Sequence, residues 1–164
     1  MTRSALALLA TAALVAPACD DSGSTYQVTG HLTSNTCGLG APDPWTFDVQ
    51  VSRQGSTLYW TWLDGTAPIS GPVNAQSEAT LTGSQQDNVD GTVDGGLGPC
   101  TLERDDTVAL ALPAGATPST FSGTINYAFS VVTGSDCSDQ LAASGGQYGA
   151  LPCAITYSMT GSRQ

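Results

Sequence analysis

The residue types that most often carry enzyme chemistry are sparse in this sequence. Its one histidine, His31, lies between Gly30 and Leu32 on the polar side of an alternating stretch. No Gly-x-Ser-x-Gly or His-Glu-x-x-His motif is present, so no motif indicates that this imidazole belongs to a catalytic triad or a metal site. We expect a solvent-facing histidine on a strand, with no metal centre and no cofactor. Acidic residues are plentiful, so hydrolysis by two carboxylates stays open, although no spacing identifies the pair.

One acidic stretch resembles the middle of a calcium-binding loop. Asn88, Asp90 and Asp94 place oxygen ligands around a glycine turn, as in loops that bind calcium through alternating side chains. Gln86 and Leu97 stand where such a loop has its first acidic ligand and its bidentate glutamate. The favoured interpretation is therefore an ordinary Asp-Gly turn, with calcium as a weak alternative.

Three tryptophans form the best candidate for a binding site. Trp60 and Trp62 face the same way along one expected strand, and Trp45 lies across the expected hairpin from them. Tyr59 points the opposite way. Aromatic side chains in strands usually belong to the core. The alternative is that the three tryptophans line the mouth of a barrel, where they bind a small apolar ligand or stack on a sugar.

Five cysteines are present: Cys19, Cys37, Cys100, Cys137 and Cys153. In an exported protein an odd cysteine needs an explanation, and a lipid on Cys19 leaves four for disulfides in an oxidising compartment. We expect Cys137 to pair with Cys153 across a loop and Cys37 to pair with Cys100, which is one of three possible connectivities. A zinc site is disfavoured because no two cysteines lie at Cys-x-x-Cys spacing.

The N-terminal segment is typical of an export signal. Arg3 precedes an apolar run over residues 5–15, which is shorter than the roughly 20 residues of a membrane span. We assign residues 1–18 to a signal peptide and residues 19–24 to a polar tether. Acylation of Cys19 would hold the tether at the cell envelope.

The cleavage region also allows a second interpretation. Ala16 and Pro17 occupy positions where a bacterial lipobox usually has other residues. Ala16-Pro17-Ala18 fits the ordinary signal peptidase as well, which would release a soluble secreted protein. The odd cysteine count favours the lipid-anchored protein.

Acidic residues dominate the charge of the chain. It has 14 Asp and Glu against 4 Lys and Arg, a formal net charge of −10 at pH 7. Such a surface repels phosphate backbones and anionic headgroups. We expect no nucleic-acid partner, membrane contact only through the lipid, and a monomer. Solubility is the favoured interpretation of the charge, and a cation-attracting surface is the alternative.

Alternation of apolar and polar residues is the main structural signal in residues 25–164. Strands are expected at 26–32, 45–51, 58–62, 69–73, 79–83, 100–104, 108–112, 121–131 and 153–160. Gln54-Gly55 predicts a hairpin turn, and Asp105-Asp106 predicts a second one. A loop rich in Gly and Asp is expected between the strand ending at Gly83 and Cys100.

These strands predict an all-β fold. Most have one apolar face, and successive hairpins with short turns favour an antiparallel meander. We expect a disulfide-bonded β-domain over 25–164 that closes as a lipocalin-like barrel, with a β-sandwich as the runner-up.

Several short motifs resemble those of small envelope lipoproteins of the myxobacterial type, a largely uncharacterised group. The residues that carry the resemblance are the Ala18-Cys19 junction, Asn35-Thr36-Cys37-Gly38, Phe121-Ser122-Gly123-Thr124, Leu151-Pro152-Cys153 and the end of the last strand near Arg163. The resemblance implies a location in the cell envelope and no particular activity.

Three functions fit these observations. The favoured one is a non-enzymatic surface lipoprotein that binds a small ligand or an envelope partner. The alternatives are a structural coat lipoprotein without a defined ligand and a carboxylate-based hydrolase.

Overall fold

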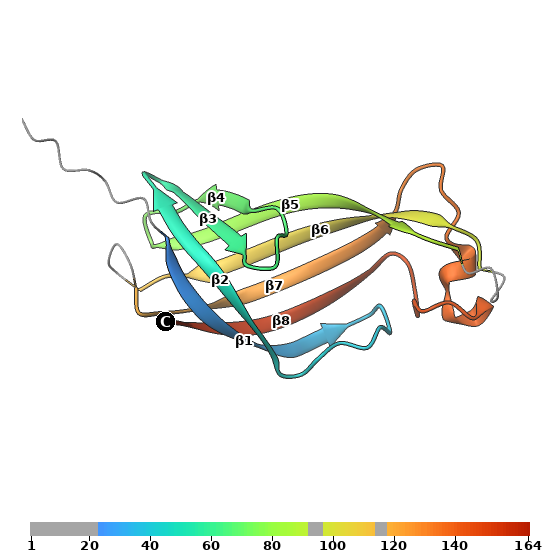
Figure 1. The fold of residues 1–164 in the computed structure, drawn as a ribbon, viewed down its shortest axis with the longest axis horizontal. Coiled ribbons are helices and arrows are strands. Elements are labelled where there is room, and N and C mark those ends of the chain that lie inside the picture. Colours follow the sequence, from blue (N-terminus) through green and yellow to red (C-terminus); the bar gives the residue numbers. More distant parts are fainter. Residues whose placement is uncertain (1–22, 92–96, 114–117) are drawn as a thin grey trace, which may run out of the picture.

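The computed structural model describes residues 23–91, 97–113 and 118–164. Eight strands follow one another along the chain, with two short 3-10 helices before the last (Figure 1). The elements are β1 (Ser24–Asn35), β2 (Trp45–Gln54), β3 (Thr57–Trp62), β4 (Ile69–Pro72), β5 (Glu78–Val89), β6 (Cys100–Ala111), β7 (Thr120–Val131), η1 (Ser138–Gln140), η2 (Ala142–Ser144) and β8 (Cys153–Arg163). The expected signal peptide, Cys19 and most of the expected tether lie outside the described residues. Within the described residues, no helix is long and apolar enough to cross a membrane.

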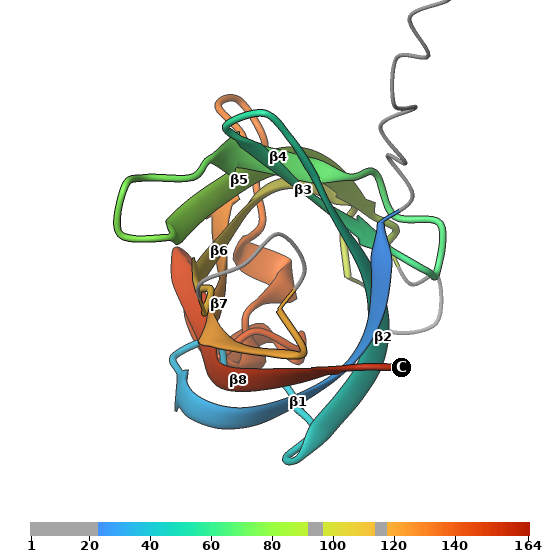
Figure 2. The same ribbon diagram turned by 90° about the vertical axis from the view of Figure 1, so that its left-hand side faces the viewer.

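The strands form a closed antiparallel barrel in sequential order. Each strand pairs with its neighbour in the chain, and β1 closes the barrel by pairing with β8 over nine residues on each strand. Figure 2 looks along the barrel and shows the sheet curving round on itself. The predicted all-β meander that closes as a lipocalin-like barrel is confirmed, and the chain does not adopt the sandwich.

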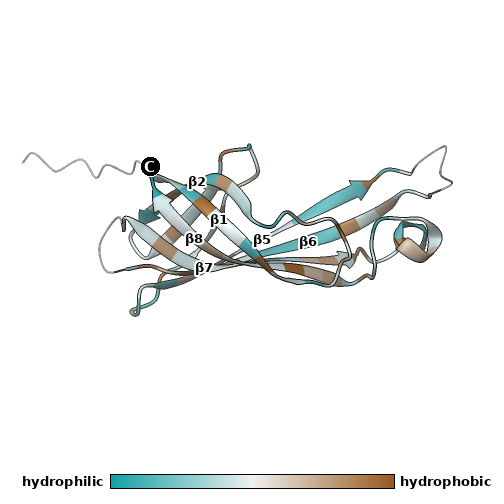
Figure 3. Ribbon diagram, turned by 90° about the horizontal axis from the view of Figure 1, so that it is seen from below, coloured by the Kyte–Doolittle hydropathy of each residue, from teal (hydrophilic) through white to brown (hydrophobic). Residues whose placement is uncertain are grey.

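Alternation along each strand decides which side chains fill the barrel. On β8, for example, Ile155, Tyr157 and Met159 are buried inside, whereas Thr156 and Ser158 between them lie on the outer face. Figure 3 shows hydrophilic and hydrophobic residues alternating along strands such as β6 and β7. The apolar side of the sheet is therefore the inside of the barrel, as the sequence pattern predicts.

One end of the barrel is filled with large side chains. Tyr26 and Trp60 are almost completely buried there, and the ring of Phe121 lies 5.1 Å from that of Tyr26 and 5.7 Å from that of Trp60. Gly161 faces Phe121 so closely that a Cβ atom would lie 2.2 Å from the ring. This end is a packed core, and the start of β1 and the end of β8 lie beside it.

The opposite end is less regular because the strands differ in length. β5 and β6 pair along their whole length, but β5 meets β4 only at Ser70 and Thr82 and at the isolated bridge between Val73 and Ala79. The β5–β6 hairpin therefore extends beyond β3 and β4, as Figure 1 shows. Within the described residues, the barrel wall is therefore incomplete where the β5–β6 hairpin extends beyond β3 and β4.

Two sequence-based expectations about strands are wrong. β6 is one unbroken strand, so Asp105-Asp106 is not a hairpin turn, and β5 continues to Val89, well past the expected end at Gly83. Both errors come from polar residues that face the inside of the barrel. Arg104 and Asp106 sit at inward positions of β6, where they neutralise each other.

The disulfide connectivity also differs from the expectation. Cys37 pairs with Cys153 and Cys100 pairs with Cys137, with Cα–Cα distances of 4.9 and 5.2 Å. Cys137 does not pair with Cys153, because β1 and β8 are neighbours in the closed barrel and bring Cys37 beside Cys153. Barrel closure, which sequence separation does not reveal, selects the partners.

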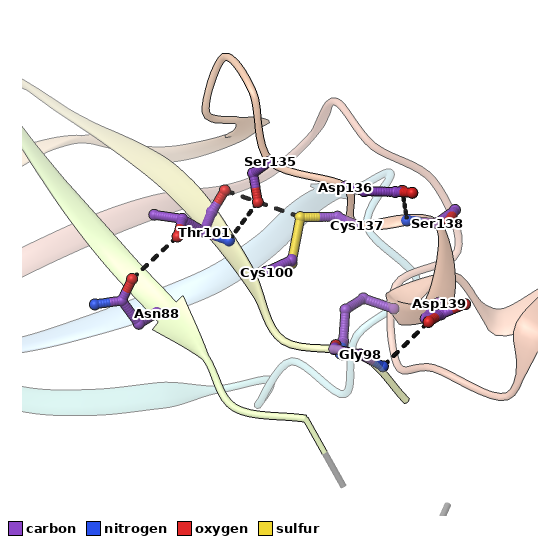
Figure 4. Close-up of a disulfide and its surroundings, with 10 residues drawn as sticks. Asn88, Gly98, Cys100, Thr101, Ser135, Asp136, Cys137, Ser138 and Asp139 are labelled. Atoms are coloured by element: carbon purple, nitrogen blue, oxygen red, sulfur yellow. Dashed lines mark hydrogen bonds between the residues drawn. A yellow bond between two sulfur atoms is a disulfide. The ribbon is translucent and has the colours of Figure 1, made fainter. Parts of the chain in front are cut away.

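The second disulfide fastens the loop after β7 onto the start of β6 (Figure 4). The Thr101 N–H donates a 2.8 Å hydrogen bond to the Ser135 hydroxyl, and the Gly98 N–H donates one of 3.1 Å to Asp139. The buried Gln140 amide donates to the Gly98 carbonyl at 2.8 Å. These contacts give a fixed position to a loop with little regular structure.

Candidate functional site

A cavity of about 350 Å³ opens into the barrel on the side where the wall is incomplete. Five aromatic side chains line it: Trp45, Trp62, Tyr127, Phe129 and Tyr157. We call this cavity the aromatic cup. Arg104 also contributes to its lining, and residues 39–42 with Asp64 and Thr66 form its rim. Ligand pockets in proteins commonly have ~300–1,000 Å³ of volume and mostly apolar walls with a few polar groups, which the cup matches.

Trp45 is the central member of the aromatic wall. Its ring lies 6.1 Å from that of Trp62, with an interplanar angle of 25°, and 5.3 Å from that of Tyr157. The ring of Tyr127 is 6.1 Å away on a third side. Trp62 ends β3 opposite Val49, and Trp45 begins β2 four residues earlier, so the two indoles meet beyond the last β2–β3 pair. The wall therefore offers large, rigid ring faces to the cavity.

Local hydrogen bonds hold the loops that form the rim. The Asn35 side-chain oxygen accepts from the backbone N–H groups of Cys37 (3.0 Å) and Gly38 (3.2 Å), and its amide donates to the Leu39 carbonyl at 2.7 Å. Together with the Cys37–Cys153 disulfide, Asn35 fixes the loop after β1. The Asn35-Thr36-Cys37-Gly38 motif thus positions one wall of the aromatic cup.

Asp64 anchors the opposite side of the rim. Its carboxylate accepts a 2.9 Å hydrogen bond from the backbone N–H of Thr66. This hydrogen bond lowers the pKa of Asp64 below its ordinary value, so the side chain is charged at neutral pH. The rim therefore carries a fixed negative charge and a hydrogen-bond acceptor.

An ion pair lies at the inner end of the aromatic cup. The Arg104 guanidinium donates from Nε to Asp106 at 2.8 Å and from Nη2 at 2.9 Å. The Asp106 side chain is 6% exposed, whereas that of Arg104 is 22% exposed and reaches the cavity. The guanidinium also lies over the ring of Tyr127, 5.2 Å from its centroid. Arg104 is thus held in place and still presents donors to the cup.

Burial and charge together set the protonation of this pair. Burial raises the pKa of Asp106, and the hydrogen bonds from Arg104 oppose that shift. Burial acts against the charge on Arg104, yet the hydrogen bond to Asp106 and the negative charges of Asp106 and Asp87 raise its pKa. The guanidinium stays positive at every physiological pH, and Asp106 supplies its countercharge.

The two tyrosines of the cup are neutral donors and acceptors. Burial raises the pKa of Tyr127 far above its ordinary value, with the charge of Asp106 adding to the shift. Burial also raises the pKa of Tyr157. Both phenols therefore keep their protons at neutral pH.

The three tryptophans of the sequence prediction separate into two environments. Trp45 is partly exposed and lines the aromatic cup. Trp62 also lines the cup but is only 7% exposed, and Trp60 is fully buried in the packed core beneath it. Trp60 thus belongs to the core, which is the favoured interpretation for such residues. The indole N–H groups of Trp60 and Trp62 find no hydrogen-bond acceptor among the described residues.

The other sequence candidates lie away from the cup. His31 is on the outer face of β1 with its side chain 66% exposed, and its Nδ1 is 3.3 Å from the Asp43 carboxylate. The prediction of a solvent-facing histidine is confirmed. His31 borders a shallow hollow of about 600 Å³ on the outer surface of β1 and β5–β8, which is larger than the cup. Threonine, serine and alanine side chains line most of that hollow, with His31 and Glu78 as its ionisable groups, and it has no tryptophan, tyrosine or phenylalanine.

The calcium candidate is not assembled in the part of the chain that the structure describes. Asn88 belongs to β5, and its side-chain oxygen accepts a 3.1 Å hydrogen bond from Thr101. Asp90 follows the strand and is exposed, and Asp94 lies outside the described residues. Among the described residues, no three His, Cys, Asp or Glu side chains are grouped so that they could hold a metal ion.

Sequence reasoning missed the polar part of the site. Arg104 and Asp106 were assigned to the end of a strand and to a turn, and Tyr127 was assigned only to a strand. The signal was available, because Cys100, Leu102, Arg104, Asp106, Val108 and Leu110 form one unbroken alternating series. An arginine and an aspartate two residues apart on the apolar side of a strand indicate an internal ion pair.

The fold and site define a small, disulfide-bonded, eight-stranded antiparallel barrel with an aromatic cavity at its open side. Comparisons with protein-family models, curated proteins and solved structures gave no match.

Proposed function

We propose that this chain is a non-enzymatic, exported lipoprotein of the cell envelope that binds a small ligand in the aromatic cup. The observation that carries the proposal is the pairing of Trp45 and Trp62 around a cavity of about 350 Å³ with Arg104 at its inner end. Rigid aromatic faces with a few oriented polar groups are the usual composition of a small-molecule site. The export signal and the odd cysteine support the location and the lipid on Cys19.

The placement of the termini supports the lipid anchor. Ser24 pairs with Val51 at the packed end of the barrel, and the Gln164 N–H donates to the Thr25 carbonyl there at 3.0 Å. Figure 1 shows the start of β1 and the C-terminus at the same end. A tether from a lipidated Cys19 would thus reach the barrel at the end away from the aromatic cup. The cup would face away from the membrane, where a ligand can enter.

Intact mass spectrometry of the protein purified from a native membrane tests the anchor. We expect a mature chain that begins at Cys19 and carries the added mass of acyl chains. A mature chain without acyl mass, or one that retains residues 1–18, would contradict the lipoprotein.

Intrinsic tryptophan fluorescence tests the binding site. We expect at least one probe among neutral saccharides, fatty acids and small aromatic compounds to change the emission, because Trp45 and Trp62 line the cup. The change should be lost in the Trp45→Phe, Trp62→Phe double variant, in which Trp60 is the remaining fluorophore. Emission unchanged by every probe would contradict the proposal.

A further inference from the structure

The aromatic cup combines two features that together restrict its ligand. Its walls are ring faces, and its inner end is an ion pair whose charges cancel. We propose that the ligand is a short neutral saccharide that stacks on Trp45, contacts the small exposed part of Trp62 and hydrogen-bonds to Arg104 and Asp64. This inference rests on the proposed function, since it names the ligand class of the same cup.

The aromatic wall suits the faces of a sugar ring. The C–H groups of a pyranose carry slight positive charge and pack against the negative face of an aromatic ring. Trp45 and Trp62 are 6.1 Å apart at a shallow angle of 25°, and Tyr157 lies 5.3 Å from Trp45. Trp62 and Tyr157 are 7% and 3% exposed, so they support the wall from behind, and the partly exposed Trp45 offers the main surface on which a flat, weakly polar face can lie.

The polar groups of the cup, Arg104 and Asp64, suit the hydroxyls at the edge of a sugar ring. Asp106 occupies Nε and Nη2 of Arg104, and Nη1 makes no hydrogen bond within the described residues. Arg104 can therefore donate to a hydroxyl oxygen, and the Asp64 carboxylate at the rim can accept from a hydroxyl hydrogen. A hydroxyl both donates and accepts, so one neutral ligand satisfies both groups.

A fatty acid fits this cavity poorly. Tyr26 and Trp60 are almost completely buried beneath the aromatic cup, so the barrel has no deep apolar channel for an acyl chain. An apolar group placed against Arg104 would also remove water from its free N–H groups without replacing the hydrogen bonds, which is unfavourable. The ion pair at the inner end thus selects for a ligand with hydroxyls.

An anionic ligand fits poorly as well. Asp106 already neutralises Arg104, and the nearby Asp64 and Asp87 leave the surroundings of the cup negative. An anion would meet this negative charge. A neutral ligand with hydroxyls avoids that repulsion.

Isothermal titration calorimetry with the mature soluble domain tests this proposal. The probes are maltose, cellobiose, trehalose and di-N-acetylchitobiose, with laurate and indole as apolar comparisons. We expect at least one disaccharide to bind the wild-type protein and neither apolar probe to bind. Trp45→Ala should weaken disaccharide binding by about tenfold, the effect of losing one aromatic contact. Tyr59→Ala is the matched control, because Tyr59 lies on the neighbouring strand and faces outward; its affinity should match the wild type.

The outcomes separate this inference from the proposed function. Binding of laurate or indole that is lost in Trp45→Ala, without binding of any disaccharide, would overturn the saccharide and keep the cup as a binding site. Disaccharide binding that Trp45→Ala leaves intact would place the sugar elsewhere and overturn the inference. If no probe of any class binds, both the saccharide and the proposed function are contradicted.

Discussion

The Arg104 guanidinium forms two hydrogen bonds, of 2.8 and 2.9 Å, with the carboxylate of Asp106 two residues further along the same strand. Residues two apart on a strand face the same side, so both side chains enter the barrel together. Their mutual neutralisation allows two charges to occupy an otherwise apolar interior. The pair also gives the aromatic cup its polar inner end.

Losing one partner of this ion pair should therefore lower the free energy of unfolding more than losing both. Arg104→Met leaves a buried carboxylate without a counterion, and we expect the free energy of unfolding to fall by about 3–5 kcal/mol. The Arg104→Met, Asp106→Leu double variant removes both charges and should recover much of that loss. Urea unfolding followed by circular dichroism measures both values. Equal losses in the single and double variants would show that the pair contributes no coupling.

The sequence predicts much of this fold and little of its site. Alternating residues in stretches such as 121–131 define an inside and an outside, and short hairpins define their order, so an antiparallel barrel follows from local information. The orientation of Arg104 and Asp106 does not, because charged residues usually face water. Cys37 and Cys153 come together only when β1 meets β8, a contact between distant parts of the chain. Local pattern therefore describes the strands, and closure of the barrel assembles the cup.

The disulfide connectivity gives a second prediction. Mass spectrometry of peptides from the unreduced protein should recover Cys37 linked to Cys153 and Cys100 linked to Cys137. A peptide that links Cys137 to Cys153 would contradict the barrel closure described above.

The two disulfides should also differ in their effect on stability. The Cys37–Cys153 bond closes a loop with a sequence separation of 116 residues, against 37 for Cys100–Cys137. By loop entropy, removing these bonds with paired serine substitutions costs about 5 and about 4 kcal/mol respectively. Chemical denaturation of the two double variants checks the order. A larger loss without Cys100–Cys137 would contradict the entropy argument.

Substitutions of Trp60 and Trp45 should distinguish the packed core from the aromatic cup by their effect on stability. Trp60 is fully buried in the packed end, so Trp60→Ala should lower the free energy of unfolding by about 3–5 kcal/mol. Trp45 is only partly buried at the cavity wall, and Trp45→Ala should cost clearly less. Urea unfolding compares them directly. If Trp45→Ala were the more destabilising change, the division between core and cup would be wrong.

Buried tyrosines make the protein sensitive to base. Burial raises the pKa of Tyr26, Tyr148 and Tyr157 in the folded protein, while in the unfolded chain tyrosine ionises near pH 10. The folded state thus keeps protons that the unfolded chain releases. This contribution to stability is complete below about pH 10 and is lost as the pH rises through the folded-state pKa values.

Absorbance at 295 nm during an alkaline titration measures tyrosine ionisation. We expect these tyrosines to ionise together with the loss of near-ultraviolet circular dichroism, as base unfolds the barrel. Ionisation of all five tyrosines near pH 10 with the near-ultraviolet signal intact would contradict their burial.

The indole N–H resonances of the three tryptophans test the binding site most directly. In a 15N-labelled protein titrated with the four disaccharides, the Trp45 and Trp62 resonances should shift with a common saturation curve. The Trp60 resonance should stay nearly unchanged, because that side chain is buried in the core beneath the cup. Shifts confined to backbone amides on the outer face of the barrel, with the Trp45 and Trp62 resonances unmoved, would contradict the aromatic cup as the binding site.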